Sequence, residues 1–122
     1  MVTPSRSQTV PIRPLELYRI VRTDPPTLLD MTSKAALGLI DPAADDETRR
    51  LESGLSMYRT LAQARRKAPA FRFLGSFIAM VDLTGVESVV IERTTSSSGH
   101  FTVWGEPTVI LRCVVAVDRV EG

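Results

Sequence analysis

The chain has 122 residues, of which 43% are hydrophobic and 24% are charged, and its formal net charge is +1 at neutral pH. This balance is that of one globular domain with a core large enough to fold alone, and the small net charge gives no indication of nucleic-acid binding. No apolar run approaches the roughly 20 residues that a membrane-spanning helix requires, so we expect no membrane association.

The single cysteine, Cys113, excludes an intramolecular disulfide and lies in an apolar run, so it is expected to be a small buried hydrophobe. This cysteine usage favours a reducing compartment, and we expect a cytoplasmic protein of bacterial type. His100 is the only histidine, so the chain has too few soft ligands for a structural zinc site, and no metal is expected.

The first part of the chain is predicted to be a lead-in followed by a strand. Residues 1–14 contain three prolines and no apolar stretch, which predicts a flexible segment rather than a secretory signal. Residues 15–122 are expected to form the single domain. Its first element is a strand over residues 17–23, which ends at the sequence Asp-Pro-Pro.

Three helices are predicted in the middle of the chain, over residues 27–38, 45–53 and 60–68. Thr60 and Gln63 give the third helix the spacing of a capping box, in which each side chain binds the main-chain amide of the other residue. Thr27 and Asp30 give the first helix a weaker version of the same pattern. A short strand over residues 54–58 separates the last two helices.

From residue 77 onward the pattern is that of strands, over residues 77–83, 86–93, 100–104 and 109–117. The last of these is the most hydrophobic, and we therefore expect it to be central in the sheet. One strand, a helical middle and then several strands predict an α+β fold with a mostly antiparallel, split β-sheet, rather than a wound parallel one.

The common nucleotide-binding and catalytic motifs are absent, since the sequence contains no GxxxxGK[ST], GxGxxG, HExxH or GxSxG. Weaker signals remain, and the first is Arg19. It shares a strand face with Leu17 and Val21, so it should point toward the core or into a cleft, where a guanidinium suits bidentate binding of an anion. The alternative is an arginine paired with a buried carboxylate or extended into solvent at the strand end.

Two further signals follow along the chain. In residues 54–58, Ser56 and Tyr58 share a face just before a helix begins. The free amides at the start of that helix favour a bound anion, and the tyrosine ring can stack on an aromatic ring of a ligand. The alternative is ordinary packing of the tyrosine. In residues 100–106, His100, the only tryptophan and Glu106 follow a serine-rich loop. Glu106 is expected at the start of the last long strand, and a hairpin turn with an exposed acid is the alternative.

In this order the three signals resemble the ADP-ribosyltransferase fold family. Its members have an Arg or His on the first strand, a Ser or Tyr strand that runs into a helix, and a Glu near a late strand after a flexible loop. Residues 17–19, residues 54–65 and Glu106 would match these features. The sequence departs from the toxin-like members at Trp104, where they carry Gln or Glu, and Glu92 is an alternative acid that precedes the loop.

The resemblance implies that NAD binds in a cleft between the two halves of the sheet. Arg19, with Tyr18 beside it, would hold a phosphate or ribose, and Ser56 would support that site. Tyr58 would stack on the nicotinamide, and His100 is assigned to the same cofactor site.

The resemblance also implies catalytic roles for Glu106 and Arg19. Glu106 would hydrogen-bond the ribose and stabilise the positive charge that develops at its anomeric carbon as nicotinamide leaves. The implied activity is transfer of ADP-ribose to a protein or nucleic acid, or hydrolysis of NAD, as in a bacterial toxin. This hypothesis predicts that Arg19, Tyr58 and Glu106 converge on one cleft.

Two other functions remain open at the level of the sequence. The first is a non-catalytic binding protein, in which those side chains would be scattered or engaged in internal pairs. The second is a contact with nucleic acid through basic residues on two helices: Arg49, Arg50, Arg65, Arg66 and Lys67.

Overall fold

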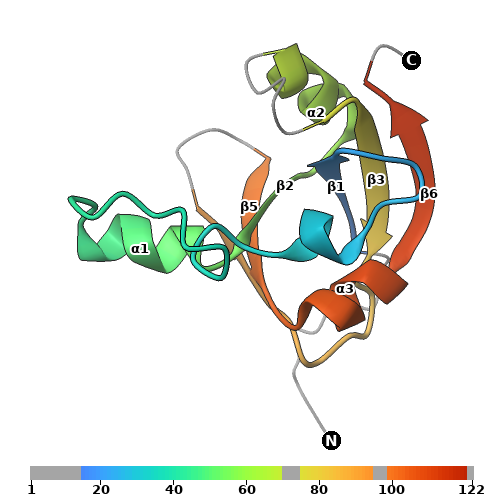
Figure 1. The fold of residues 1–122 in the computed structure, drawn as a ribbon. Coiled ribbons are helices and arrows are strands. Elements are labelled where there is room, and N and C mark those ends of the chain that lie inside the picture. Colours follow the sequence, from blue (N-terminus) through green and yellow to red (C-terminus); the bar gives the residue numbers. More distant parts are fainter. Residues whose placement is uncertain (1–14, 70–74, 95–98, 121–122) are drawn as a thin grey trace, which may run out of the picture.

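The computed structural model describes residues 15–69, 75–94 and 99–120. They form an α+β fold, as predicted, in which three short α-helices and one 3-10 turn accompany a six-stranded antiparallel sheet (Figure 1). The elements in chain order are β1 (Glu16–Val21), η1 (Leu28–Met31), α1 (Asp46–Glu52), β2 (Leu55–Tyr58), α2 (Leu61–Lys67), β3 (Phe77–Asp82), β4 (Val90–Arg93), β5 (His100–Trp104), α3 (Pro107–Arg112) and β6 (Val114–Arg119).

The sheet is split at its centre. Its strand order is β4-β5-β2-β1-β3-β6, and every neighbouring pair is antiparallel. β1 pairs with β3 along its whole length, from Glu16 to Val21. In contrast, β1 meets β2 in the ladder at a single pair, Tyr18 opposite Tyr58. The two strands therefore separate beyond that pair, and the sheet consists of a β4-β5-β2 half and a β1-β3-β6 half.

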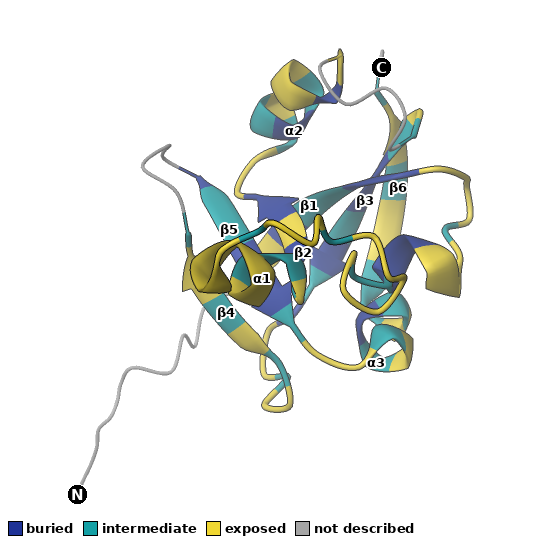
Figure 2. Ribbon diagram, turned by 60° about the vertical axis from the view of Figure 1, so that its left-hand side comes forward, coloured by how far each residue is buried: buried dark blue, intermediate teal, exposed yellow. Residues whose placement is uncertain are grey.

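Apolar side chains pack on both faces of the sheet, because alternate residues of β1 point to opposite sides. Leu17 and Val21 belong to one buried cluster, which includes Met31 of η1 and Ile110 of α3. Ile20 belongs to a second cluster, formed with residues of α2 and with Tyr58. The strands therefore carry most of the buried positions in Figure 2, and the helices cover them from either side.

The local sequence signals account for α1 and α2. Asp45 caps α1, since its carboxylate accepts a hydrogen bond from the Thr48 amide at 2.7 Å. The predicted capping box of α2 is confirmed: the Gln63 amide donates to the Thr60 hydroxyl at 3.1 Å, and the Thr60 amide donates to the Gln63 side chain at 3.2 Å.

The predicted helix over residues 27–38 is wrong beyond its first turn. Asp30 does close the start, where its carboxylate accepts from the Thr27 amide at 2.9 Å. The chain then leaves the helical region at Thr32, and residues 34–38 form turns. The physical reason lies in packing: Met31 is buried, whereas Leu28 one turn before it is 46% exposed, so no continuous apolar side of this segment is covered and a longer helix is not stabilised.

The predicted strand over residues 109–117 is also wrong in its first half, and its expected central position in the sheet is wrong. Pro107 occupies the first turn of a helix, α3, where its fixed φ suits helix initiation. Ile110 on α3 is fully buried in the first cluster, and this tertiary contact overrides the β preference of the Val-Ile-Leu run. The strand that follows, β6, lies at the edge of the sheet rather than at its centre, with Val115 59% exposed.

A smaller difference concerns the predicted strand over residues 86–93. The ladder with β5 begins only at Val90, opposite Trp104. Residues before it turn, and the Val86 amide donates to the Leu83 carbonyl at 3.1 Å.

The packing of α3 predicts a large effect of truncation at its buried position. We expect Ile110→Ala to lower the free energy of unfolding by about 2–5 kcal/mol, because it removes buried methyl groups and leaves a cavity. Val115→Ala is the control, and its effect should stay within about 0.5 kcal/mol because the side chain is largely exposed. Urea denaturation followed by circular dichroism measures both, and equal effects would contradict the placement of α3.

Candidate functional site

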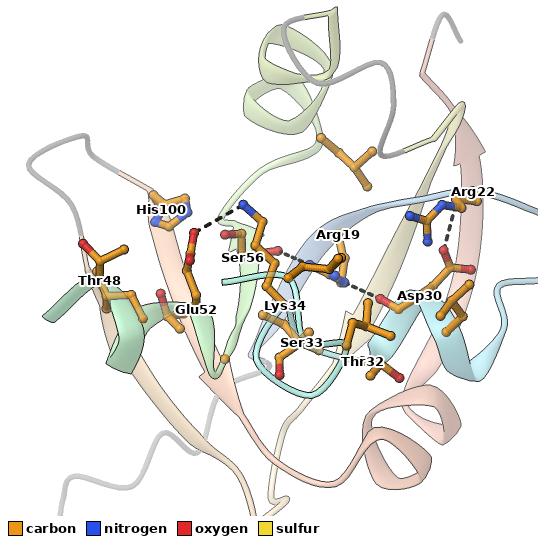
Figure 3. A pocket seen from close by; sticks show the side chains of 18 residues that line it. Arg19, Arg22, Asp30, Thr32, Ser33, Lys34, Thr48, Glu52, Ser56 and His100 are labelled. Carbon is orange, nitrogen blue, oxygen red and sulfur yellow. Dashed lines mark hydrogen bonds and ion pairs between the residues drawn. The ribbon is translucent and has the colours of Figure 1, made fainter. Parts of the chain in front are cut away.

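A cavity of about 400 Å³ opens where β1 and β2 separate (Figure 3). This volume is in the range of small-molecule sites. Its strand side carries Arg19, Ser56, His100 and Thr102, and its outer wall is formed by residues of η1, the segment that follows η1, and α1.

Arg19 bridges the split in the sheet. Its Nε donates to the Asp30 main-chain carbonyl at 2.8 Å, and its Nη1 donates to the Ser56 carbonyl at 2.9 Å. Nη2 makes no hydrogen bond to any residue in the described part of the chain. Burial lowers the pKa of Arg19 to about 10, an effect that the nearby Asp30 carboxylate opposes. The guanidinium therefore stays charged at neutral pH, with one donor group available to a ligand.

Asp30 is a buried carboxylate whose two oxygens are both engaged. Oδ1 accepts from the Arg22 amide at 2.9 Å, and Oδ2 accepts from the Thr27 amide at 2.9 Å. These bonds fix the turn between β1 and η1. They also place the Arg22 side chain among the residues that line the cavity, where it adds a second positive charge.

A short chain of hydroxyl and imidazole groups lies on the β5 side. The Thr94 hydroxyl is 2.7 Å from the buried Thr102 hydroxyl and 3.2 Å from Nδ1 of His100. Burial, and then the positive charge of Lys67, lowers the pKa of His100. The imidazole is therefore neutral at pH 7, and its ring can offer either a donor or an acceptor to a ligand.

Three exposed leucines form an apolar part of the outer wall. Leu29, Leu37 and Leu39 line the cavity with 50%, 38% and 65% of their surface accessible. They line the same cavity as Arg19 and Arg22, so the cavity combines apolar surface with positive charge.

The wall is tied to the C-terminal end of α1 through Glu52. Lys34 forms an ion pair with Oε2 of Glu52 at 3.3 Å, and the Ala35 amide donates to the Glu52 carbonyl at 3.1 Å. α1 is in turn held to β5, since Nε1 of Trp104 donates to the Arg50 carbonyl at 3.1 Å and the Arg50 guanidinium lies 5.3 Å from the centre of the indole ring.

Of the residues predicted for the site, three line this cavity: Arg19, Ser56 and His100. The prediction that Arg19 shares a face with Leu17 and Val21 is consistent with the burial of those two residues in one cluster. Both of its hydrogen bonds within the described residues go to main-chain carbonyls, and the buried Asp30 carboxylate acts on it through charge, so the alternative of a buried carboxylate partner is met in part.

The two predicted tyrosines do not line the cavity. Tyr18 and Tyr58 pack in the cluster beneath α2, and the Tyr58 ring meets the His100 ring edge-on at 5.4 Å. Burial raises the pKa of Tyr58. Its place is the ordinary packing that the sequence left as the alternative, and two residues of the cavity lining lie near it, His100 by ring contact and Arg19 by charge.

Glu106 also lies outside the residues that line the cavity, and it does not begin a strand. It is the exposed N-cap residue of α3, because the chain turns into a helix at Pro107. The expected convergence of Arg19, Tyr58 and Glu106 on one cleft is therefore not found. The alternative acid, Glu92, is exposed and pairs with Arg50 at 2.8 Å.

The sequence missed the two carboxylates of the cavity, Asp30 and Glu52. For Asp30 a signal existed, namely its capping-box spacing to Thr27, but that spacing does not indicate a neighbouring arginine. Glu52 had only its position at the end of the second predicted helix. Asp30 comes to Arg19 through the turn between β1 and η1, and Glu52 comes to the same cavity because the segment after η1 returns to α1, neither of which a spacing in the sequence shows.

Three of the five basic residues considered for nucleic-acid binding are engaged internally, and one of them is Arg65, whose Nη2 donates to the Arg119 carbonyl at 3.4 Å. Arg49 donates to the carbonyls of Pro42 and Ala44, at 2.7 and 3.1 Å. Arg50 forms ion pairs with Glu47 and Glu92. Of the five, only the exposed Arg66 and Lys67 on α2 make no internal hydrogen bond or ion pair within the described residues.

Within residues 15–69, 75–94 and 99–120, no group of three or more His, Cys, Asp or Glu side chains is placed to hold a metal ion. None of the helices in this part of the chain combines the length and apolar character needed to cross a bilayer.

Comparison with protein families, with curated proteins and with solved structures finds no match to this chain.

The lowered pKa of His100 predicts a pH dependence of stability. A folded pKa below the ordinary 6.5 means that protonation favours the unfolded chain, so this contribution is present above pH 6.5 and is lost as the pH falls through the folded value. We expect the wild type to lose more stability between pH 7.5 and pH 5 than His100→Gln, which keeps a polar side chain but cannot titrate. Parallel urea titrations at the two pH values measure the difference, and identical losses would contradict the assignment.

Proposed function

We propose that the cavity between β1, β2 and the segment after η1 binds a nucleotide with the chemistry of NAD. The observation that carries the proposal is the pairing of two arginines, Arg19 and Arg22, with a wall of exposed leucines in one cavity. Phosphate groups suit the guanidinium donors, and a flat base or nicotinamide ring suits the apolar wall. The resemblance to the ADP-ribosyltransferase fold family supports the same ligand class.

The reaction that this ligand offers is cleavage of its glycosidic bond. The bond between C1′ of the ribose and the nicotinamide nitrogen breaks, and its electron pair leaves with neutral nicotinamide. Water then bonds to C1′ and gives up a proton, or a nucleophile on a macromolecule takes the place of water. Positive charge develops at C1′ on the way, and a carboxylate close to it lowers the barrier.

The second candidate is a binding protein without catalysis, and the position of Glu106 favours it. The acid that the family pattern would supply lies at the N-cap of α3, outside the cavity lining. Under this alternative NAD or a related nucleotide binds, but nicotinamide is not released.

Titration with NAD tests the proposal and separates the two candidates. We expect NAD to bind to the wild-type protein in isothermal titration calorimetry and to raise its melting temperature. Release of nicotinamide, followed by chromatography, then distinguishes an enzyme from a binding protein. Absence of any binding would overturn the proposed function in both forms.

The positive charge of the cavity predicts the effect of one substitution. We expect Arg22→Gln to weaken NAD binding about tenfold, because it removes a cation that has no ion pair within the described residues. Arg112→Gln, on the exposed side of α3, is the matched control and should leave the affinity unchanged. Equal affinities of the two variants would contradict this role for Arg22.

A further inference from the structure

We propose that Glu52 is the residue of the cavity that accepts hydrogen bonds from ribose hydroxyl groups of the ligand. This inference rests on the proposed function and deepens it, since it selects ligands that carry a ribose next to a phosphate. Glu52 is the last residue of α1, and its side chain lines the cavity together with Ser56 and Arg19.

The first argument compares the two carboxylates of the cavity. Both oxygens of Asp30 already accept main-chain amides, so Asp30 has a structural task. Glu52 binds Lys34 through Oε2, and its Oε1 makes no hydrogen bond to any residue that the structure describes. An ionised carboxylate accepts several hydrogen bonds, so Glu52 retains acceptor capacity at the cavity.

The second argument is the position of Glu52 on its helix. A negative side chain at the C-terminal end of a helix meets the negative end of the helix dipole and is unfavourable there. Arg49 and Arg50 precede it with the favourable sign. Helix stability therefore does not explain an acid at this position, whereas a contact with a ligand or with the wall does.

The third argument comes from the surroundings of the carboxylate. Glu52 and Arg19 line the same cavity, which also contains the apolar wall (Figure 3). A ligand that satisfies all three has an anionic group, hydroxyl donors and a flat apolar ring, which is the composition of a ribonucleotide.

The competing explanation is that Glu52 only tethers the wall to α1 through Lys34. A matched variant separates the two, because Lys34→Gln removes the same ion pair but keeps the carboxylate. Glu52→Gln removes the charge of the acceptor and keeps the shape of the side chain, and the main-chain bond from the Ala35 amide is retained in both variants.

The test measures coupling between the side chain and the ligand hydroxyls. Affinities are determined by calorimetry for NAD and for two analogues that lack a 2′-hydroxyl, one on each ribose. In the wild type and in Lys34→Gln, we expect at least one analogue to bind about tenfold more weakly than NAD. In Glu52→Gln this difference should fall below about threefold.

Each outcome decides the inference. Loss of the hydroxyl discrimination in Lys34→Gln as well as in Glu52→Gln would show a tether only and would overturn it. If Glu52→Gln still binds NAD about tenfold better than the analogue, or if the wild type binds both equally, the inference is also overturned. In both cases NAD still binds, so the proposed function survives. Failure of NAD to bind to the wild type would overturn both together.

Discussion

The hydrogen bonds of the Arg19 guanidinium connect the two halves of the sheet where the strand ladder is interrupted. Beyond the single ladder pair of Tyr18 and Tyr58, strands β1 and β2 separate, and Arg19 spans the gap to the Ser56 carbonyl. Its second bond, to the Asp30 carbonyl, fixes η1 against the same gap. A charged side chain thus takes the place of a strand ladder, and the cavity exists because the ladder stops there.

The wall of the cavity depends on the same turn. The Asp30 carboxylate accepts hydrogen bonds from the Thr27 amide at the start of η1 and from the Arg22 amide. These bonds hold the turn that follows β1, and Arg22 in this turn lines the cavity. The segment after η1 then returns to α1, where the Glu52 carboxylate forms an ion pair with Lys34 and the Glu52 carbonyl accepts a hydrogen bond from the Ala35 amide. This path brings arginines and leucines into one cavity, and our proposal of a nucleotide ligand rests on that combination.

Local sequence signals predicted the parts that local chemistry determines. The α+β class, the capped helices α1 and α2, and strands β1, β2 and β5 follow from alternation and capping, and Arg19, Ser56 and His100 do line the cavity. The errors arise where tertiary packing decides. Ile110 draws a β-prone run into α3, which moves Glu106 to a helix N-cap, and burial beneath α2 removes Tyr58 from the ligand side. No spacing in the sequence could assign Glu52 and Arg19 to one cavity, because that depends on a non-helical path after Met31.

The strand order has a consequence for self-association. Among the strands that the structure describes, β4 and β6 are outermost and have a ladder partner on one side only, and such edges are where another extended chain can pair. Each edge is short and carries charge: Glu92 and Arg93 on β4, Asp118 and Arg119 on β6. Pairing of a second sheet at either edge would have to strip water from these groups, so the edges resist aggregation although Val90 and Val115 are exposed there.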